Sequence, residues 1–277
     1  MDDVNVSIIS ISSDIGTAAA TRWMEQGYNV AGTYRTQSDA TALLEQSGAF
    51  LTPCDLSDVA SIDQASGRMK DHFEAWDVLM TCPATMEPIG DFLECDIDAW
   101  CESVALNCTR QMRFLHALLP SRRRDSPQLP LVIMFTGPGT NDARRHLSAE
   151  ILGKISQLKM CELLSEEIED ARFVIVGPGW VNTKVHGETI KAGSAAGSNY
   201  QRTIDILESG KTTPISRVVD FLDWAIEQPR DVISGRNFSI VNDIWGEKRL
   251  NDKLSQTPDM FKMRRFLNDW QGDHGDY

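Results

Sequence analysis

The chain has 277 residues, 42% hydrophobic and 24% charged, and its formal net charge is −13. This composition excludes a mainly disordered chain, and the length suffices for a full hydrophobic core. No apolar stretch reaches the roughly 18 residues that a membrane helix needs, and the acidic start of the chain is unlike a secretory signal. The negative charge disfavours nucleic acid or an anionic membrane as a partner. We therefore expect a cytoplasmic globular protein that acts on a small molecule.

The cysteines point to a reducing compartment and not to a metal site. None of the six belongs to a C-x-x-C pair, and they stand inside apolar segments, so we expect reduced and mostly buried thiols. They are Cys54, Cys82, Cys95, Cys101, Cys108 and Cys161.

Strand-like and helix-like segments alternate along the chain, beginning with a β-branched apolar run. The predicted strands are 4–11, 28–34, 50–53, 78–82, 131–136 and 173–176. The predicted helices between and after them are 16–26, 40–46, 59–73, 97–119 and 143–169. Alternation of this kind with nearly continuous apolar strands predicts a parallel sheet covered by helices on both faces, the doubly wound α/β fold. Such sheets bind ligands beyond the carboxyl ends of their strands.

The last hundred residues contain less regular patterns. Residues 177–214 are small and polar, as in a lid or binding loop, and we take 184–213 as the substrate loop. A helix over 218–227 and a last strand over 237–241 follow. Residues 1–243 are then one domain and 244–277 an extension, whose amphipathic stretch 251–270 has Phe261, Phe266 and Trp270 as apolar anchors.

Two segments at predicted strand ends resemble motifs of one enzyme family. The turn at 9–16 lies between the first strand and the first helix, where dinucleotide phosphates meet helix amides. Residues 177–184, Gly-Pro-Gly-Trp-Val-Asn-Thr-Lys, follow the sixth strand. With Lys154 inside the helix between them, the chain resembles the short-chain dehydrogenase/reductase family over about residues 4–243. The resemblance implies a Rossmann-type fold and a nicotinamide cofactor.

The turn departs from the family pattern T-G-x-x-x-G-x-G. Ile9 and Ser10 replace its first two residues, and Asp14 replaces the middle glycine, while Gly16 is kept. Glycine allows a tight turn there and serine carries a Cβ, and the aspartate adds a negative charge beside the expected phosphates. The family's N-N-A-G segment falls on 81–84, Thr-Cys-Pro-Ala, which has lost the pattern.

The resemblance also assigns the nucleotide site. Arg35 ends the second strand, where a basic residue suits the 2′-phosphate of NADP, so NADP(H) is expected over NAD(H). Asp55 stands where the family's aspartate meets adenine. The predicted cofactor-binding residues are Ser10, Ser12, Ser13, Asp14, Ile15, Gly16, Arg35, Asp55, Leu56, Cys82, Lys154, Pro178, Gly179, Val181 and Thr183.

The catalytic stretch differs most from the family. The family uses Tyr-x-x-x-Lys with a serine about 13 residues upstream; here Lys154 is kept, Glu150 takes the tyrosine position, and Gly137 the serine position. Thr136 or Thr140 offers a hydroxyl nearby. Asn107 matches the helix asparagine of the family's proton relay. The predicted catalytic residues are Asn107, Thr136, Glu150 and Lys154.

A glutamate changes the acid–base chemistry that tyrosine would perform. A free glutamate has a pKa of about 4.3, and a cationic Lys154 one turn away should lower it further, so we expect Glu150 to be ionised at pH 7 unless burial opposes this. It is then a general base or simply the ion-pair partner of Lys154. If the helix reaches His146, this histidine shares their face and supplies an acid. The predicted substrate contacts are His146, Trp180 and His186.

Three functions fit these residues. The first is an NAD(P)-dependent oxidoreductase of a small alcohol or ketone. The second is a non-redox lyase or isomerase with Glu150 as base, and the third is an inactive family member that acts as a binding or assembly partner. The resemblance further implies a homodimer or homotetramer formed through the helices at 97–119 and 143–169.

Overall fold

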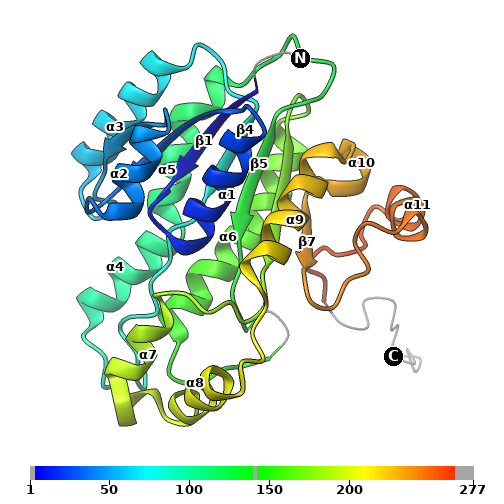
Figure 1. Ribbon diagram of the computed structural model, residues 1–277. Coiled ribbons are helices and arrows are strands. Elements are labelled where there is room, and N and C mark those ends of the chain that lie inside the picture. Colours follow the sequence, from blue (N-terminus) through cyan, green and yellow to red (C-terminus); the bar gives the residue numbers. More distant parts are fainter. Residues whose placement is uncertain (1–3, 140–141, 266–277) are drawn as a thin grey trace, which may run out of the picture.

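The computed structural model describes residues 4–139 and 142–265, and its centre is a sheet of seven parallel strands in the order β3-β2-β1-β4-β5-β6-β7 (Figure 1). The order reverses direction after β1, since β4 pairs with β1 on the side opposite β2. The strands are β1 (Asn5–Ile9), β2 (Asn29–Tyr34), β3 (Phe50–Pro53), β4 (Val78–Thr81), β5 (Leu131–Phe135), β6 (Arg172–Gly177) and β7 (Arg236–Ser239). The predicted doubly wound, Rossmann-type fold is confirmed.

Helices cover both faces of the sheet. α1 (Asp14–Glu25), α2 (Asp39–Gln46) and α9 (Ile215–Glu227) pack on one face, and α3 (Val59–His72), α5 (Thr109–Leu118) and α6 (Ser148–Glu167) pack on the other. α4 (Ile97–Asn107) lies along α6. Two separate cores result, because successive strand residues point to opposite faces. Val6 and Ile8 of β1 belong to the first core and Ile9 belongs to the second.

The predicted helix at 97–119 is two helices. Cys108, with φ −142° and ψ −77°, interrupts it between α4 and α5. The side chain of Gln111 compensates the break, because its amide donates to the carbonyl of Leu106 at 3.0 Å. A 3-10 turn, η1 (Leu119–Ser121), ends the pair. Hydrophobic periodicity continues across the break and could not reveal it.

The predicted substrate loop contains regular structure. Within it the chain forms α7 (His186–Ala192), the 3-10 turn η2 (Gly193–Ala196) and α8 (Ser198–Ser209). These elements lie beyond the carboxyl ends of the strands, with α7 near α4 and α8 below α6 in Figure 1. The segment is therefore a two-helix lid over the edge where this fold binds ligands.

The chain after β7 packs on the first core. α10 (Arg230–Ile233) precedes β7, and α11 (Lys248–Gln256) follows it and buries Leu250 and Leu254. The Phe261 ring lies 5.3 Å from that of Phe238. The predicted anchors Phe266 and Trp270 lie outside the described residues. No helix in the described ranges is long and apolar enough to cross a membrane.

Candidate active site

The turn between β1 and α1 keeps a glycine-like conformation at Ser10. Ser10 has φ +60°, a region that side chains other than glycine rarely adopt. Its amide donates to Thr33 Oγ1 at 2.9 Å, which fixes the turn. A Cβ at Gly16 would lie 2.7 Å from Ser13 Oγ and 2.9 Å from the Ser10 carbonyl oxygen, which is too close for a side chain without a shift of the turn. The turn is therefore tight although two of the three motif glycines are replaced, by Ser10 and Asp14.

Ser10→Gly is expected to stabilise the fold by about 0.5–1 kcal/mol, because glycine adopts this positive φ without strain. Chemical denaturation of both proteins measures the change. Ser12→Gly nearby is the control and should destabilise or leave stability unchanged, since Ser12 has no positive φ. A loss of stability in Ser10→Gly would contradict the strain argument.

Asp14 connects the turn to the segment after β6. Asp14 is the first residue of α1, whose cap is the Ser13 hydroxyl that accepts from the Gly16 amide. One Asp14 carboxylate oxygen accepts from the Lys184 backbone amide at 2.8 Å, and the other lies 3.8 Å from Lys184 Nζ. The negative charge that the sequence places beside the turn is thus partly balanced by a lysine.

The other predicted nucleotide contacts lie along the carboxyl ends of β2 to β4. Asp55 is exposed, and the backbone and hydroxyl of Ser57 donate to it, which together with the Arg35 charge lowers the pKa of the carboxyl. Leu56 is buried, and the Cys82 amide donates to Ile9 at 3.0 Å. Arg35 is exposed at the end of β2, open to a ligand on that side.

Lys154 and Asn107 organise the loop that follows β4. Lys154 is 4% exposed and its Nζ donates to the carbonyl of Pro83 at 3.3 Å. Asn107 is fully buried; its Oδ1 accepts from the Thr85 amide at 3.2 Å and its Nδ2 donates to the Thr85 carbonyl at 2.8 Å. Gln111 donates to Pro83 as well, at 3.1 Å. These contacts hold the divergent 81–84 segment in place.

Glu150 occupies the space beside Gly137. The Glu150 side chain is 4% exposed, and a Cβ built on Gly137 would overlap its Oε1. The two departures from the family pattern are therefore complementary, because loss of the serine side chain makes room for the carboxyl. Its Oε2 is buried and accepts no hydrogen bond within the described part of the chain.

The expected direction of the Glu150 pKa shift is wrong. Burial raises its pKa to about 7, and the charge of Lys154 opposes this only in part. Burial also lowers the pKa of Lys154. The predicted i, i+4 ion pair is not formed, since Lys154 Nζ points to Pro83. Near neutral pH, Glu150 therefore exists in both protonation states, as a group that gives and takes protons should.

A cavity of about 830 Å³ lies between the lid and the carboxyl ends of β5, β6 and β7. Thr136 and Gly137 after β5, and Pro178, Gly179 and Trp180 after β6, form part of its wall. Gly179 has φ +76° and a Cβ there would meet Val241 and Thr213.

Among the other predicted cofactor-binding residues, Val181 is buried and the Thr183 carbonyl accepts from the His186 amide at 3.2 Å. Ile15, at the start of α1, packs on the first core.

Of the three predicted substrate contacts, Trp180 and His186 line this cavity and His146 does not. The Trp180 and His186 rings stack at 3.7 Å, and His186 Nε2 lies 2.9 Å from the Val181 carbonyl oxygen. Burial lowers the pKa of His186, which favours the neutral ring.

The predicted helix at 143–169 begins only at Ser148, so His146 does not share a helix face with Glu150. His146 has φ +68°, which is incompatible with a right-handed helix. Its Nδ1 lies 3.4 Å from Asp91 Oδ1, and its ring lies against Gly197. The arrangement with His146 as the acid for Glu150 is therefore excluded by the backbone. Thr140 lies outside the described residues.

Glu188 of the lid is a site residue that the sequence did not indicate. Its Oε2 accepts from the Thr85 hydroxyl at 3.1 Å and from the amides of Met86 at 2.6 Å and Glu87 at 3.2 Å. Asn107 binds the backbone of the same Thr85, so the asparagine and the lid meet at one loop. A lone glutamate in a polar segment carries no signal that would have revealed this.

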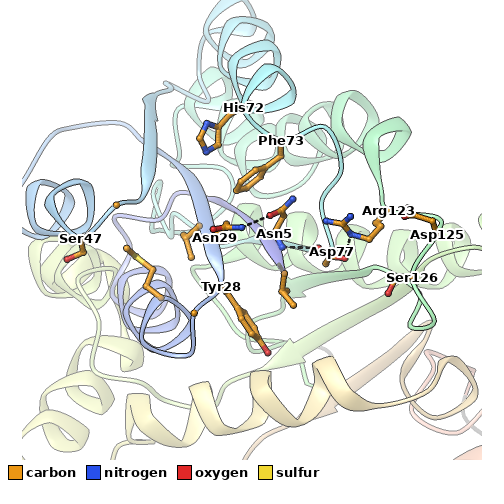
Figure 2. A pocket seen from close by; sticks show the side chains of 15 residues that line it. Asn5, Tyr28, Asn29, Ser47, His72, Phe73, Asp77, Arg123, Asp125 and Ser126 are labelled. Atoms are coloured by element: carbon orange, nitrogen blue, oxygen red, sulfur yellow. Dashed lines mark hydrogen bonds and ion pairs between the residues drawn. The ribbon is translucent and has the colours of Figure 1, made fainter. Parts of the chain in front are cut away.

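A second cavity, of about 1090 Å³, lies at the opposite, amino-terminal edge of the sheet (Figure 2). Asn5 and Asn29 are hydrogen-bonded at 3.0 Å, and Asp77 pairs with Arg123 at 2.7 Å. The polar groups there bind one another and join the starts of β1, β2 and β4. This cavity lies at the edge opposite the predicted catalytic residues, and we assign it no catalytic role.

Comparison with known proteins decides the family. The family model described as enoyl-(acyl carrier protein) reductase matches residues 10–231, well over half of the chain. The chain belongs to the short-chain dehydrogenase/reductase family. A search of curated proteins finds no significant match.

Solved structures of this family share the fold at low sequence identity. A short-chain dehydrogenase/reductase from Saccharomyces cerevisiae has a TM-score of 0.76 and 16% identity, covering 90% of this chain and 98% of that one. A variant of actinorhodin polyketide ketoreductase with NADPH scores 0.73 at 18% identity, covering 86% and 95%. A short-chain dehydrogenase from Shigella flexneri complexed with NADP scores 0.71 at 16% identity, covering 87% and 98%. At these identities the likeness shows the fold of a short-chain dehydrogenase/reductase and not the substrate.

Proposed function

We propose that this family member is an NADP(H)-dependent oxidoreductase of a small alcohol or ketone, in which Glu150 performs the proton transfer that the family assigns to tyrosine. The observation that carries the proposal is the buried Glu150 carboxyl, with a pKa of about 7, which lies against Gly137. Gly137 lines the cavity, whereas Glu150 itself is not one of its lining residues. No separate observation favours the non-redox or the inactive alternative.

The chain's residues fit a dinucleotide along the strand ends. The left-handed Ser10 preserves the tight turn, and the α1 amides face the position that phosphates take in this fold. The charge of Asp14 is partly balanced by Lys184. Arg35 and Asp55 would hold the adenosine end, and Pro178 to Thr183 the nicotinamide end. When bound, the cofactor supplies or accepts the hydride.

The protein's own part is to position and protonate the reacting oxygen. Protonated Glu150 donates its proton to a carbonyl oxygen during reduction, and ionised Glu150 takes it back from an alcohol. Lys154 limits the rise of the Glu150 pKa and is held by Pro83. Thr136 Oγ1, which is buried without a partner in the described structure, offers a hydrogen bond to the same oxygen.

Thermal unfolding with added cofactor tests the proposal. NADPH at about 100 times its dissociation constant should add about 2.7 kcal/mol to stability, and NADH should add less. Arg35→Ser should weaken the NADPH effect and leave the NADH effect unchanged, because only the 2′-phosphate contact is lost. Stability that responds to neither cofactor would overturn the proposal.

We also propose that the chain acts as a homodimer or homotetramer in the cytoplasm. The outer faces of α4 and α6 carry apolar side chains that are well exposed in the single chain, Ile97 at 56%, Leu152 at 44% and Leu163 at 42%. Association through these helices would remove that surface from water.

A further inference from the structure

The cavity under the lid is lined by positive charge in a strongly acidic protein. Four cationic side chains stand around it, against Asp142 as the one lining carboxylate within the described ranges. These cations are Arg144, Arg202, Lys211 and Arg217. The chain as a whole has a net charge of −13, so the lining of the cavity is positively charged in a negatively charged protein.

Two of these cations have no partner in the described part of the protein. Arg144 pairs with Asp142 at 3.1 Å, and Arg217 donates to the Ile240 carbonyl at 3.1 Å. Arg202, on α8, and Lys211, just after it, form no side-chain hydrogen bond or ion pair with the described chain, and both are exposed. Guanidinium and ammonium groups at the mouth of a cavity attract carboxylate and phosphate oxygens.

The floor of the cavity supplies a second, independent observation. Thr136 is 7% exposed, and its Oγ1 has no hydrogen-bond partner in the described structure. Asn237 Oδ1, from β7, is buried in the same way, and both residues line the cavity. Buried polar atoms without partners are rare in folded proteins, because desolvation of such an atom is not compensated by a hydrogen bond. A ligand with polar atoms would satisfy them.

We infer that this cavity binds a substrate with an anionic end, a carboxylate or phosphate group placed against Arg202 and Lys211, and a carbonyl or alcohol directed to Thr136 and to Gly137, the lining residue that Glu150 lies against. The inference rests on the proposed function for its reacting end, but the anion site itself does not. It is also distinct from the predicted 2′-phosphate site, because Arg35 follows β2 whereas the cavity lies at β5 to β7.

Matched pairs of neutral and anionic ligands test the inference without turnover. Acetoacetate and levulinate are compared with their methyl esters, and inorganic phosphate is added as an anion without a ketone. Binding to the full chain is followed by calorimetry and thermal unfolding at low and high salt. Arg202→Gln and Lys211→Gln remove the unpaired charges, and Lys253→Gln on exposed α11 is the matched control.

The expected result is that at least one anion binds tenfold or more tightly than its ester. Arg202→Gln and Lys211→Gln should each weaken that anion at least fivefold, while binding of NADPH and of the ester is unchanged and Lys253→Gln behaves as wild type. Phosphate binding that the variants weaken also supports the anion site, and its affinity relative to the carboxylates tells which group the site prefers. Equal binding of acid and ester, no binding of any anion, or anion binding that the variants leave intact would overturn the inference. Anion binding in a protein that fails to bind NADPH would refute the proposed function alone.

Discussion

Glu150→Gln is expected to lower ketone reduction by about 10²- to 10⁴-fold, the range that a general acid contributes. Glutamine has nearly the same size and fits beside Gly137, but its amide cannot give a proton to the reacting oxygen. The measurement is the rate of NADPH oxidation with a ketone that the wild-type chain reduces. Glu167→Gln, exposed on the same helix, is the control and should keep full activity.

The pH profile separates proton transfer from a structural role. Because burial raises the Glu150 pKa to about 7, reduction should need its protonated form and fall above that pH. Alcohol oxidation needs the ionised form and should rise through the same pH. Both transitions should vanish in Glu150→Gln. Unchanged reduction in this variant would refute the proposed role.

Glu150 should also make the stability of the fold depend on pH. Its pKa is higher in the folded chain than the value of about 4.3 of an exposed glutamate, so the contribution of the buried acid is fully present below about pH 4.3. That contribution is lost as the pH rises through about 7. The wild type should therefore lose up to about 3 kcal/mol relative to Glu150→Gln between pH 4 and pH 8, because a tenfold change in an acid's ionisation constant corresponds to about 1.4 kcal/mol. Denaturant unfolding of both proteins across this range measures the difference.

The strands and their parallel arrangement could be predicted from the sequence, because buried parallel strands are short apolar runs separated by clear helix patterns. The sequence was insufficient for the breaks within helices and for the helices of the lid. The break at Cys108 is compensated by Gln111, and the late start of the predicted helix at 143–169 reflects the left-handed backbone at His146. The helices of the lid lie in a Gly/Ser-rich segment whose own pattern is weak, and they are tied down by Glu188.

For the candidate site, too, the sequence predicted some features and missed others. The resemblance assigned Asn107, Glu150 and Lys154 to the candidate site, but it did not predict their contacts. Spacing along a helix predicted an ion pair between Glu150 and Lys154, whereas the fold directs Lys154 to the loop after β4 and buries the carboxyl. Desolvation then outweighs the attraction of the lysine and reverses the expected pKa shift. Burial is a property of the packed chain, which single positions in a sequence do not specify.

Gly137→Ala is expected to lower activity at least tenfold, since its methyl group would take the space of Glu150 Oε1. The carboxyl must leave its position, at a stability cost of about 1–3 kcal/mol for overpacking a buried site. Gly67→Ala is the matched control, because a Cβ there meets nothing within 4 Å, and it should not destabilise the fold.

A double-mutant cycle with Glu150→Ala tests whether the two positions act as a unit. Once the carboxyl is removed, the methyl group at position 137 has room, so the stability cost of Gly137→Ala should fall below about 0.5 kcal/mol. Additive costs in the double variant would contradict the direct contact. A large coupling would mean that a side chain can return to position 137 without this cost only after the glutamate at 150 has been replaced, since Glu150 occupies the space beside Gly137.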